Sequence, residues 1–269
     1  MRGQFERAGR LISYLEVRPP ARERQRGTLV LLHAFPLSAD MWEPQLAAAP
    51  PGWRVLAPDV AGFGRSFPVP DTATFEDDAR DVLALMDHLG QKDAAVAGLS
   101  MGGYIAFALA RLAPERLQAL VLADTRAEAD TDEARRSRRE MLETLERGGT
   151  AAVVDGMMSK LLGRTTIATR PDVAARVREI GLRQPADGIR SAIHRLLGRP
   201  DSTFLLSTIR CPTLVVAGSE DAITGPDVAR GMARHIQGAE LALVERAGHL
   251  SNLEQPEVFN AALSAFLRG

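Results

Sequence analysis

Short, uninterrupted runs of apolar residues recur along the chain, each bounded by polar or turn-forming positions. Runs of this kind, without alternating polar residues, are typical of strands buried on both faces of a parallel sheet. The polar, arginine-rich stretch that precedes them is expected to contain a further pair of strands. We predict six buried strands, at residues 28–32, 55–57, 94–97, 120–123, 214–217 and 241–244.

Helical patterns separate these strands. The clearest has apolar residues three and four positions apart between Phe75 and Leu89, with Thr74 as the candidate N-cap and acidic residues in the first turn. Because parallel strands need crossover connections, this alternation predicts an α/β protein with a mostly parallel, doubly wound sheet and helices on both faces.

One long stretch, from about residue 126 to residue 206, contains no buried strand. We expect it to be a helical insertion into the sheet protein, and we divide the chain into a core of residues 1–125 and 207–269 and a helical cap of residues 126–206. The helices expected in the insertion are 131–147, 150–162, 172–183 and 187–197.

The arginines between residues 135 and 139 stand out within this insertion. Such a block is compatible with an anionic ligand. Glu133 and Glu140 are interleaved with it, however, and mixed charges of this kind are typical of a solvated helix face. We interpret the block as such a face.

The chain has 269 residues, of which 45% are hydrophobic and 25% charged, a composition typical of a globular protein with a large core. A formal net charge of -1 gives no global attraction to nucleic acid or to anionic lipid. We therefore expect a small-molecule ligand, no nucleic-acid partner and no membrane association. The sequence does not indicate an oligomeric state.

The cysteine content and the first residues indicate the cellular compartment in which the protein is expected. Cys211 is the single cysteine, so it has no partner for an intrachain disulfide. The first residues lack the apolar core of a signal peptide, and no apolar run reaches the roughly 18 residues of a membrane-spanning helix. These features predict a cytoplasmic protein.

The sequence Gly-Leu-Ser-Met-Gly at residues 98–102 follows a predicted buried strand and precedes a helical run. In that setting the pattern predicts a sharp strand-to-helix turn with an exposed serine hydroxyl. Gly98 and Gly102 lack side chains where backbone segments must come close. An ordinary glycine-rich turn is the alternative, but both flanking elements favour Ser100 as a nucleophile at the carboxyl edge of the sheet.

A serine nucleophile needs a histidine that takes its proton and an acid that orients this histidine. His249 follows the last predicted strand and Asp221 follows the strand before it, which gives the chain order serine, acid, histidine. Glu220 and Asp124 also follow strands and remain alternatives for the acid. We prefer Asp221 because it fits both this order and a Gly-x-x-Asp loop.

Acyl transfer also needs two backbone N–H groups that face the developing oxyanion. Met101, directly after the nucleophile, is the first candidate. Phe35 is the second, in the loop that follows the strand at residues 28–32; Pro36 stiffens this loop and has no N–H of its own. The alternative interpretation of this loop is an ordinary turn at the end of a strand.

With these motifs, the sequence resembles the α/β-hydrolase family of serine hydrolases. The family's His-Gly-x-Pro loop corresponds to residues 33–36, its Asp-x-x-Gly-x-Gly-x-Ser loop to residues 59–66, and its terminal Gly-His to residues 248–249. Ala34 replaces the usual glycine, which disfavours a positive φ and leaves the aim of the Phe35 amide open. The resemblance implies the α/β-hydrolase fold with a variable helical cap.

Within this family, residues 36–42 and the compact cap look most like esterases and enol-lactonases, especially the 3-oxoadipate enol-lactonase group. The expected function is that of a carboxylic ester hydrolase, which cleaves a small ester or lactone through an acyl-enzyme without metal or organic cofactor. Perhydrolase or haloperoxidase-type chemistry and carbon–carbon bond hydrolysis on the same triad remain open. So does a non-catalytic small-ligand receptor that retains the fold.

The cap is expected to choose the substrate. Packing in the core is the alternative role for each pocket candidate. An enol-lactone substrate would also need a cationic pocket residue, and the sequence does not show which cap arginine, if any, points inward. The candidates for the pocket lining are Trp42, Met157, Leu161 and His194, with Met158 and Phe204 as further ones.

Overall fold

The computed structural model describes residues 1–69 and 72–268. At its centre lies an eight-stranded sheet in the order β1-β2-β4-β3-β5-β6-β7-β8. The six predicted strands and the N-terminal strand pair are confirmed. The predicted burial is wrong for the last strand, residues 240–244, which lies at the edge of the sheet and has only Val244 buried. The strands are β1 (Arg2–Arg7), β2 (Arg10–Val17), β3 (Gly27–Leu32), β4 (Trp53–Pro58), β5 (Ala94–Leu99), β6 (Leu117–Ala123), β7 (Thr213–Gly218) and β8 (Glu240–Val244).

Strand direction and register decide where the loops of the sheet meet. β1 pairs with β2, and β2 with β4, in antiparallel direction, whereas the neighbours from β4 through β8 are parallel. Every residue of β4, β5 and β7 is buried, as expected for strands covered on both faces. Leu32 pairs with Gly98, and Leu99 with Ala123, so β3, β5 and β6 end at one edge of the sheet.

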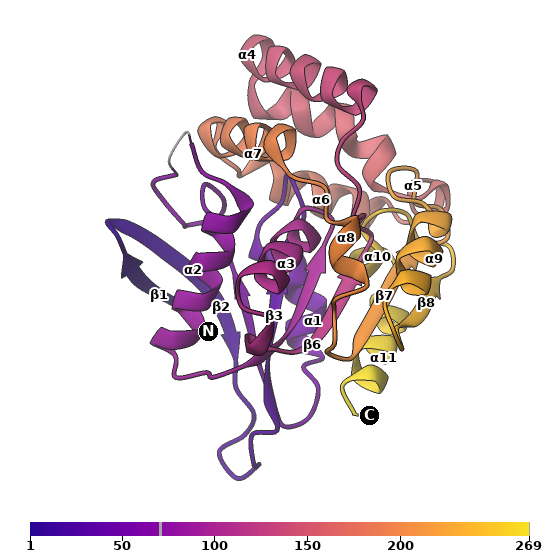
Figure 1. Ribbon diagram of the computed structural model, residues 1–269. Helices are drawn as coiled ribbons and strands as arrows, with labels where there is room; N and C mark the ends of the chain where they lie inside the picture. The colour runs from indigo at the N-terminus through magenta and orange to yellow at the C-terminus, as the bar shows by residue number, and fades with distance from the viewer. Residues whose placement is uncertain (70–71, 269) are drawn as a thin grey trace.

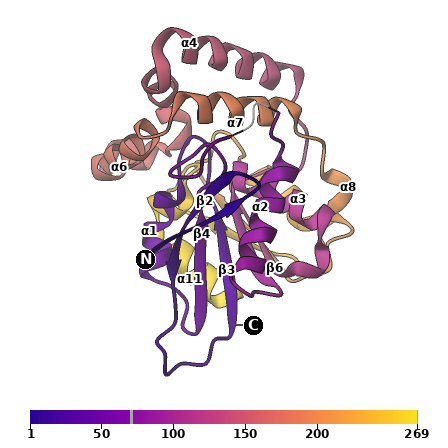
Figure 2. The same cartoon turned by 90° about the vertical axis from the view of Figure 1, so that its left-hand side faces the viewer.

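Helices cover both faces of this sheet. Figure 2 shows α2 and α3 on one side and α1 and α11 on the other, which confirms the doubly wound arrangement. The predicted N-cap Thr74 accepts a hydrogen bond from Asp77 N, and the Asp77 side chain accepts one from Thr74 N. The helices outside the β6–β7 connection are α1 (Glu43–Ala47), α2 (Phe75–His88), α3 (Met101–Leu112), α9 (Pro226–His235), α10 (Ser251–Glu254) and α11 (Pro256–Phe266), with the 3-10 turns η1 (Ala39–Trp42) and η2 (Pro114–Arg116).

Between β6 and β7 the chain forms a layer of helices above the carboxyl edge of the sheet (Figure 1). We call α4–α7 the cap. The predicted helices 131–147 and 150–162 are the two segments of α4, which is broken at Gly149, whose φ of 65° and ψ of -167° are not helical. Helices α5 and α8 were not predicted. The helices of this connection are α4 (Asp132–Leu161), α5 (Arg164–Thr169), α6 (Pro171–Leu182), α7 (Ala186–Gly198) and α8 (Thr203–Leu206).

A buried ion pair joins the cap to the core. Nη1 of Arg195 in α7 donates to both carboxylate oxygens of Asp78 in α2, at 2.8 and 2.7 Å, and its Nη2 donates to Ala61 O at 2.8 Å. Burial raises the pKa of Asp78 to about 6, although the Arg195 charge acts in the opposite direction. The cap is thus fixed to the core by a charged contact that water does not reach.

Candidate active site

The turn between β5 and α3 presents Ser100 at the carboxyl edge of the sheet. Its φ of 53° and ψ of -111° lie outside the regions that serine normally adopts. Ser100 N donates to Ala123 O at 2.9 Å, and Thr125 Oγ1 donates to Ser100 O at 2.9 Å. These two bonds hold the serine backbone in its strained conformation.

The two glycines of the motif are required by close backbone contacts. A Cβ atom on Gly98 would lie 2.3 Å from the carbonyl oxygen of Gly102. A Cβ atom on Gly102 would lie 2.1 Å from the carbonyl oxygen of Leu32 in the neighbouring strand. The sequence predicted this lack of space, and its cause is the contact of the nucleophile turn with itself and with β3.

Three predicted residues from distant parts of the chain meet at this turn. Ser100 Oγ lies 2.7 Å from His249 Nε2, and His249 Nδ1 lies 2.9 Å from Asp221 Oδ2. Because a carboxylate only accepts hydrogen bonds, Nδ1 carries the imidazole proton and Nε2 is free to accept one from the serine. His249 and Asp221 are buried, with exposed fractions of 1% and 6%.

Asp221 has more hydrogen-bond donors than the histidine alone. Its Oδ1 accepts from Ile223 N at 2.7 Å and Thr224 N at 3.0 Å, and its Oδ2 accepts from Thr224 Oγ1 at 2.7 Å. Burial raises the pKa of this carboxyl, but the His249 charge and the hydrogen bonds from His249 and Thr224 outweigh it and lower the pKa to about 2. Asp221 is therefore ionised at neutral pH.

The two alternative acids, Asp124 and Glu220, accept hydrogen bonds from residues other than His249. Asp124 is fully buried, where it accepts from Gly218 N at 2.8 Å and from the Ser251 hydroxyl. Burial raises its pKa well above the usual range, and the nearby Asp221 charge adds to this rise. Glu220 accepts from Thr165 N at 2.8 Å and Thr165 Oγ1 at 2.6 Å, so it binds the cap.

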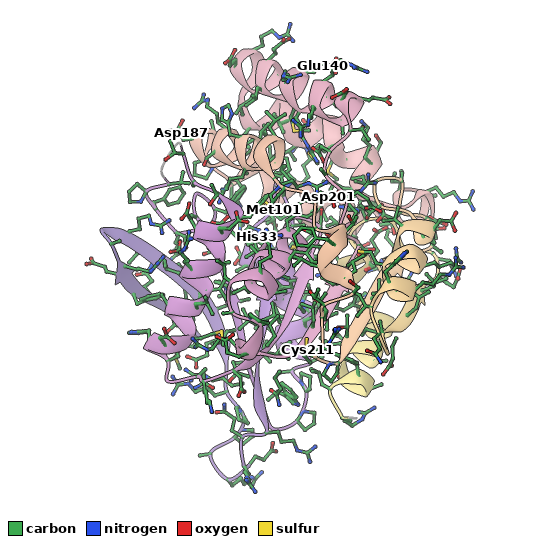
Figure 3. The ribbon with its side chains drawn as sticks, in the orientation of Figure 1. His33, Met101, Glu140, Asp187, Asp201 and Cys211 are labelled. Atoms are coloured by element: carbon green, nitrogen blue, oxygen red, sulfur yellow. The ribbon has the colours of Figure 1, made fainter. Side chains whose placement is uncertain are left out.

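The predicted oxyanion donors lie on both sides of the serine. Met101 is the first residue of α3, and Phe35 follows β3; both line the same hollow as Ser100. Within residues 1–69 and 72–268, neither amide has a protein acceptor. Figure 3 shows Met101 at the top of the sheet, directly below the cap. The N–H group of Met101 at the N-terminus of α3 and that of Phe35 in the loop after β3 fit the predicted role of oxyanion donors.

Two buried side chains shape the loops around Phe35. His33 Nδ1 donates to Ala34 O at 3.0 Å, and its Nε2 accepts from Val60 N at 2.9 Å. Burial lowers the pKa of His33 to about 4, so the ring is neutral and ties the two loops together. Asp59 accepts from Ala39 N at 3.0 Å. These contacts give His33 and Asp59 a structural role in the two loops.

A buried carboxylate that sequence reasoning gave no role holds the histidine loop. Glu254 Oε1 accepts from Gly248 N at 2.9 Å and from Leu250 N at 3.2 Å, on either side of His249. Its Oε2 accepts from Gly163 N in the cap at 2.8 Å. The sequence signal was its position five residues after the histidine, in an ending that resembles that of many family members.

The hollow beside the serine is small and lies between the core and α4 of the cap. Met157 and Leu161 from α4 belong to its wall, as predicted. Sequence reasoning missed Tyr104, whose position four residues after Ser100 on a helix was the available signal. It also assigned Arg138 to a solvated face. The full lining is Phe35, Ser100, Met101, Tyr104, Arg138, Met157, Leu161, Leu196, Ile223 and His249.

Two predictions for the pocket wall are wrong. Trp42 is fully buried in the core, where its ring lies 6.0 Å from that of Phe259 on α11. His194 lines a different hollow, beside the N-terminal turn of α2, because α7 turns this side of the helix away from the serine. Of the further candidates, Phe204 is 63% exposed and Met158 packs against the core.

A strained serine turn of this kind, on a sheet of this order, defines the class of α/β hydrolases. The family model described as alpha/beta hydrolase fold matches residues 27–256. The chain therefore belongs to this family, and it is a hydrolase. None of the described helices has the length and apolar character needed to cross a membrane.

Similar proteins are esterases and lactonases by name. The 3-oxoadipate enol-lactonase 1 of Acinetobacter baylyi is 31% identical over 228 residues, which are 85% of this chain and 84% of that protein. A thermophilic esterase from Thermogutta terrifontis, solved with malate bound, is 36% identical with a TM-score of 0.92, covering 100% of this chain and 98% of that one. The enol-lactonase from Burkholderia xenovorans LB400 is 27% identical with a TM-score of 0.89, covering 99% and 100%.

Proposed function

We propose that the protein hydrolyses a small carboxylic ester or lactone through an acyl-enzyme on Ser100. The observation that carries this proposal is the unbroken chain of hydrogen bonds from Ser100 through His249 to Asp221 beside a hollow. The names of the similar esterases and enol-lactonases support the same reaction.

In the first half of the reaction, His249 Nε2 takes the hydroxyl proton as Ser100 Oγ attacks the carbonyl carbon. The ionised Asp221 holds Nδ1–H and stabilises the imidazolium that forms. The N–H groups of Phe35 and Met101 stabilise the oxyanion, each contributing roughly 100- to 1000-fold in rate. The imidazolium then gives its proton to the leaving alkoxide, which leaves the acyl group on Ser100.

In the second half, water replaces the alcohol. His249 takes a proton from the water, whose oxygen attacks the acyl carbon, and the same two amides receive the second oxyanion. The proton returns to Ser100 Oγ as the carboxylic acid leaves. With a lactone, the alcohol and the acid remain one molecule, so the product is a hydroxy acid. The small size of the hollow suits a small acyl group.

The test compares wild-type protein with Ser100→Ala and a control, Ser207→Ala, which changes an exposed hydroxyl on the surface. The readouts are hydrolysis of p-nitrophenyl acetate and labelling by a fluorophosphonate probe. We expect Ser100→Ala to abolish labelling and to lower kcat by roughly 10⁶-fold, with the control unchanged. Wild-type protein that is neither labelled nor active would instead support a ligand-binding receptor with this fold.

A further inference from the structure

Helix α4 of the cap places a guanidinium in the wall of the catalytic hollow. Arg138 lines this hollow together with Ser100 and His249. The other lining residues are neutral side chains, most of them apolar, apart from the histidine itself. Among the described residues of the wall, Arg138 therefore has the only permanent charge. A charge beside an apolar hollow favours a ligand that carries the opposite charge.

Asp130 binds Arg138, but the same carboxylate also binds a second arginine, Arg199. Asp130 Oδ2 accepts from Arg138 Nε at 3.4 Å, and Oδ1 accepts from Arg199 Nη2 at 2.8 Å. The Asp130 and Arg199 side chains are 6% and 2% exposed, so water screens them little. Asp130 is the one carboxylate that either guanidinium contacts among the described residues, and Asp201 interacts with Arg199 through its charge. Asp130 is therefore shared and does not pair with Arg138 alone.

The contact with Asp130 also determines which nitrogens of Arg138 remain without an acceptor. Because Nε of Arg138 faces Asp130, its two terminal nitrogens have no acceptor within the part of the chain that the structure describes. Arg199, behind it, lies over the ring of Tyr104 at 4.1 Å from the ring centre, and Tyr104 lines the hollow too. A positioned guanidinium with two free nitrogens matches the planar shape of a carboxylate.

We infer that the substrate carries a carboxylate in addition to its ester or lactone group, and that Arg138 binds this carboxylate. The inference rests on the proposed function, since it names the substrate class of the same site. Asp130 acts as a positioning residue, because it orients Arg138 through Nε and leaves the outer nitrogens to the substrate. Arg138 thereby determines specificity.

The test uses two pairs of esters that match in shape and differ in charge. Monomethyl succinate has its carboxylate in the acyl part, and methyl 4-methylpentanoate is its neutral counterpart. Acetoxyacetate has its carboxylate in the alcohol part, and isobutyl acetate is its neutral counterpart. Measurements at about pH 8 keep both carboxylates ionised. The quantity of interest is the ratio of kcat/KM within each pair, which also tells on which side of the ester the carboxylate lies.

The variants are Arg138→Gln, Arg138→Lys and a control, Arg139→Gln, which removes the same charge from an exposed position on the same helix. We expect wild-type protein to prefer the charged ester of at least one pair. Arg138→Gln should lower this preference by about 10- to 100-fold, as expected for a charge-assisted hydrogen bond. Arg138→Lys should retain part of it, and Arg139→Gln should retain all of it.

Two results would overturn the inference. In the first, wild-type protein cleaves the neutral esters but prefers neither charged one, which leaves the proposed function standing. In the second, Arg138→Gln and Arg139→Gln change the ratio equally, so the effect comes from net charge rather than from contact. A protein that cleaves none of the four esters contradicts the proposed function itself.

Discussion

Gly163 of the cap donates its main-chain N–H to Glu254 at 2.8 Å, and the same carboxylate accepts from the residues on both sides of His249. Glu254 is fully buried. One side chain therefore joins the cap to the loop of the proposed base, although these segments are 91 residues apart. Any shift of this carboxylate moves the cap and the base loop together.

Replacement of Glu254 by Gln tests whether this carboxylate connects the cap to the loop of His249. The amide nitrogen of glutamine cannot accept a hydrogen bond, so at least one main-chain N–H loses its acceptor in a buried place. We expect the free energy of unfolding to fall by about 1–3 kcal/mol and kcat for p-nitrophenyl acetate to fall as well. Glu257→Gln, on the exposed side of α11, is the control. Equal behaviour of the two variants would contradict the role of Glu254.

Asp221→Asn should make His249 a much weaker base while the imidazole stays close to its present position. The uncharged amide no longer stabilises the imidazolium and allows the wrong tautomer of His249, so we expect kcat to fall by roughly 10⁴-fold. Glu220→Gln changes the neighbouring carboxylate, which binds Thr165 instead of the histidine, and should cost far less. Ester hydrolysis and the rate of fluorophosphonate labelling measure both. A larger loss in Glu220→Gln would reverse the assignment of the acid.

Two glycine-to-alanine changes should have opposite effects. Gly102→Ala places a Cβ atom 2.1 Å from Leu32 O, so the turn or β3 has to move. We expect a loss of both activity and stability. Gly156→Ala lies on the exposed side of α4, where a Cβ atom meets nothing within 4 Å. This change should stabilise the protein by up to about 1 kcal/mol, as measured by urea unfolding. A neutral Gly102→Ala variant would contradict the close contact.

The Asp78–Arg195 contact should make stability depend on pH. A carboxyl whose pKa is raised by folding stabilises the fold below its unfolded-state pKa of about 4, and this contribution is lost as the pH rises through about 6. Relative to wild type, Asp78→Asn should therefore gain stability between about pH 4 and pH 7. Unfolding in urea across this range gives the measurement.

The matched control for this pH series is Asp187→Asn. Asp187 lies at the start of α7 on the outer side of the cap (Figure 3), where its side chain is 85% exposed. Asp187→Asn removes an exposed carboxylate from the same cap and should not show the gain in stability that is expected for Asp78→Asn. If the Asp78→Asn difference is constant, or moves in the opposite direction, burial does not raise the pKa of Asp78.

The sheet and the triad could be predicted because their signals are local. A strand covered on both faces has to be apolar throughout, and the turn at residues 98–102 needs glycines on both sides of the serine. Asp221 and His249 each follow a strand, and parallel strands bring such loops to one edge. The short helices α5 and α8 escaped prediction because they lack a full amphipathic period.

The pocket wall depends on contacts that periodicity does not contain. Arg138 and Arg139 are neighbours in a mixed-charge helix, and only the orientation of α4 turns one of them toward the serine. Figure 3 shows Glu140 on the outer side of this helix, as the solvated-face interpretation expected. Trp42 was a pocket candidate as an apolar residue, and its contact with Phe259 makes it part of the core, which was the alternative role.

The hydrogen bonds between the cap and the core have a consequence for the evolution of such a protein. The cap supplies main-chain amides at residues 163 and 165 to two carboxylates of the core, and every residue type except proline has such an amide. These two contacts therefore depend on the path of the cap backbone, whereas the contact of Arg195 with Asp78 depends on a cap side chain. Under the proposed role of Arg138, a substitution there changes the substrate preference and leaves the Ser100 turn and these attachments in place.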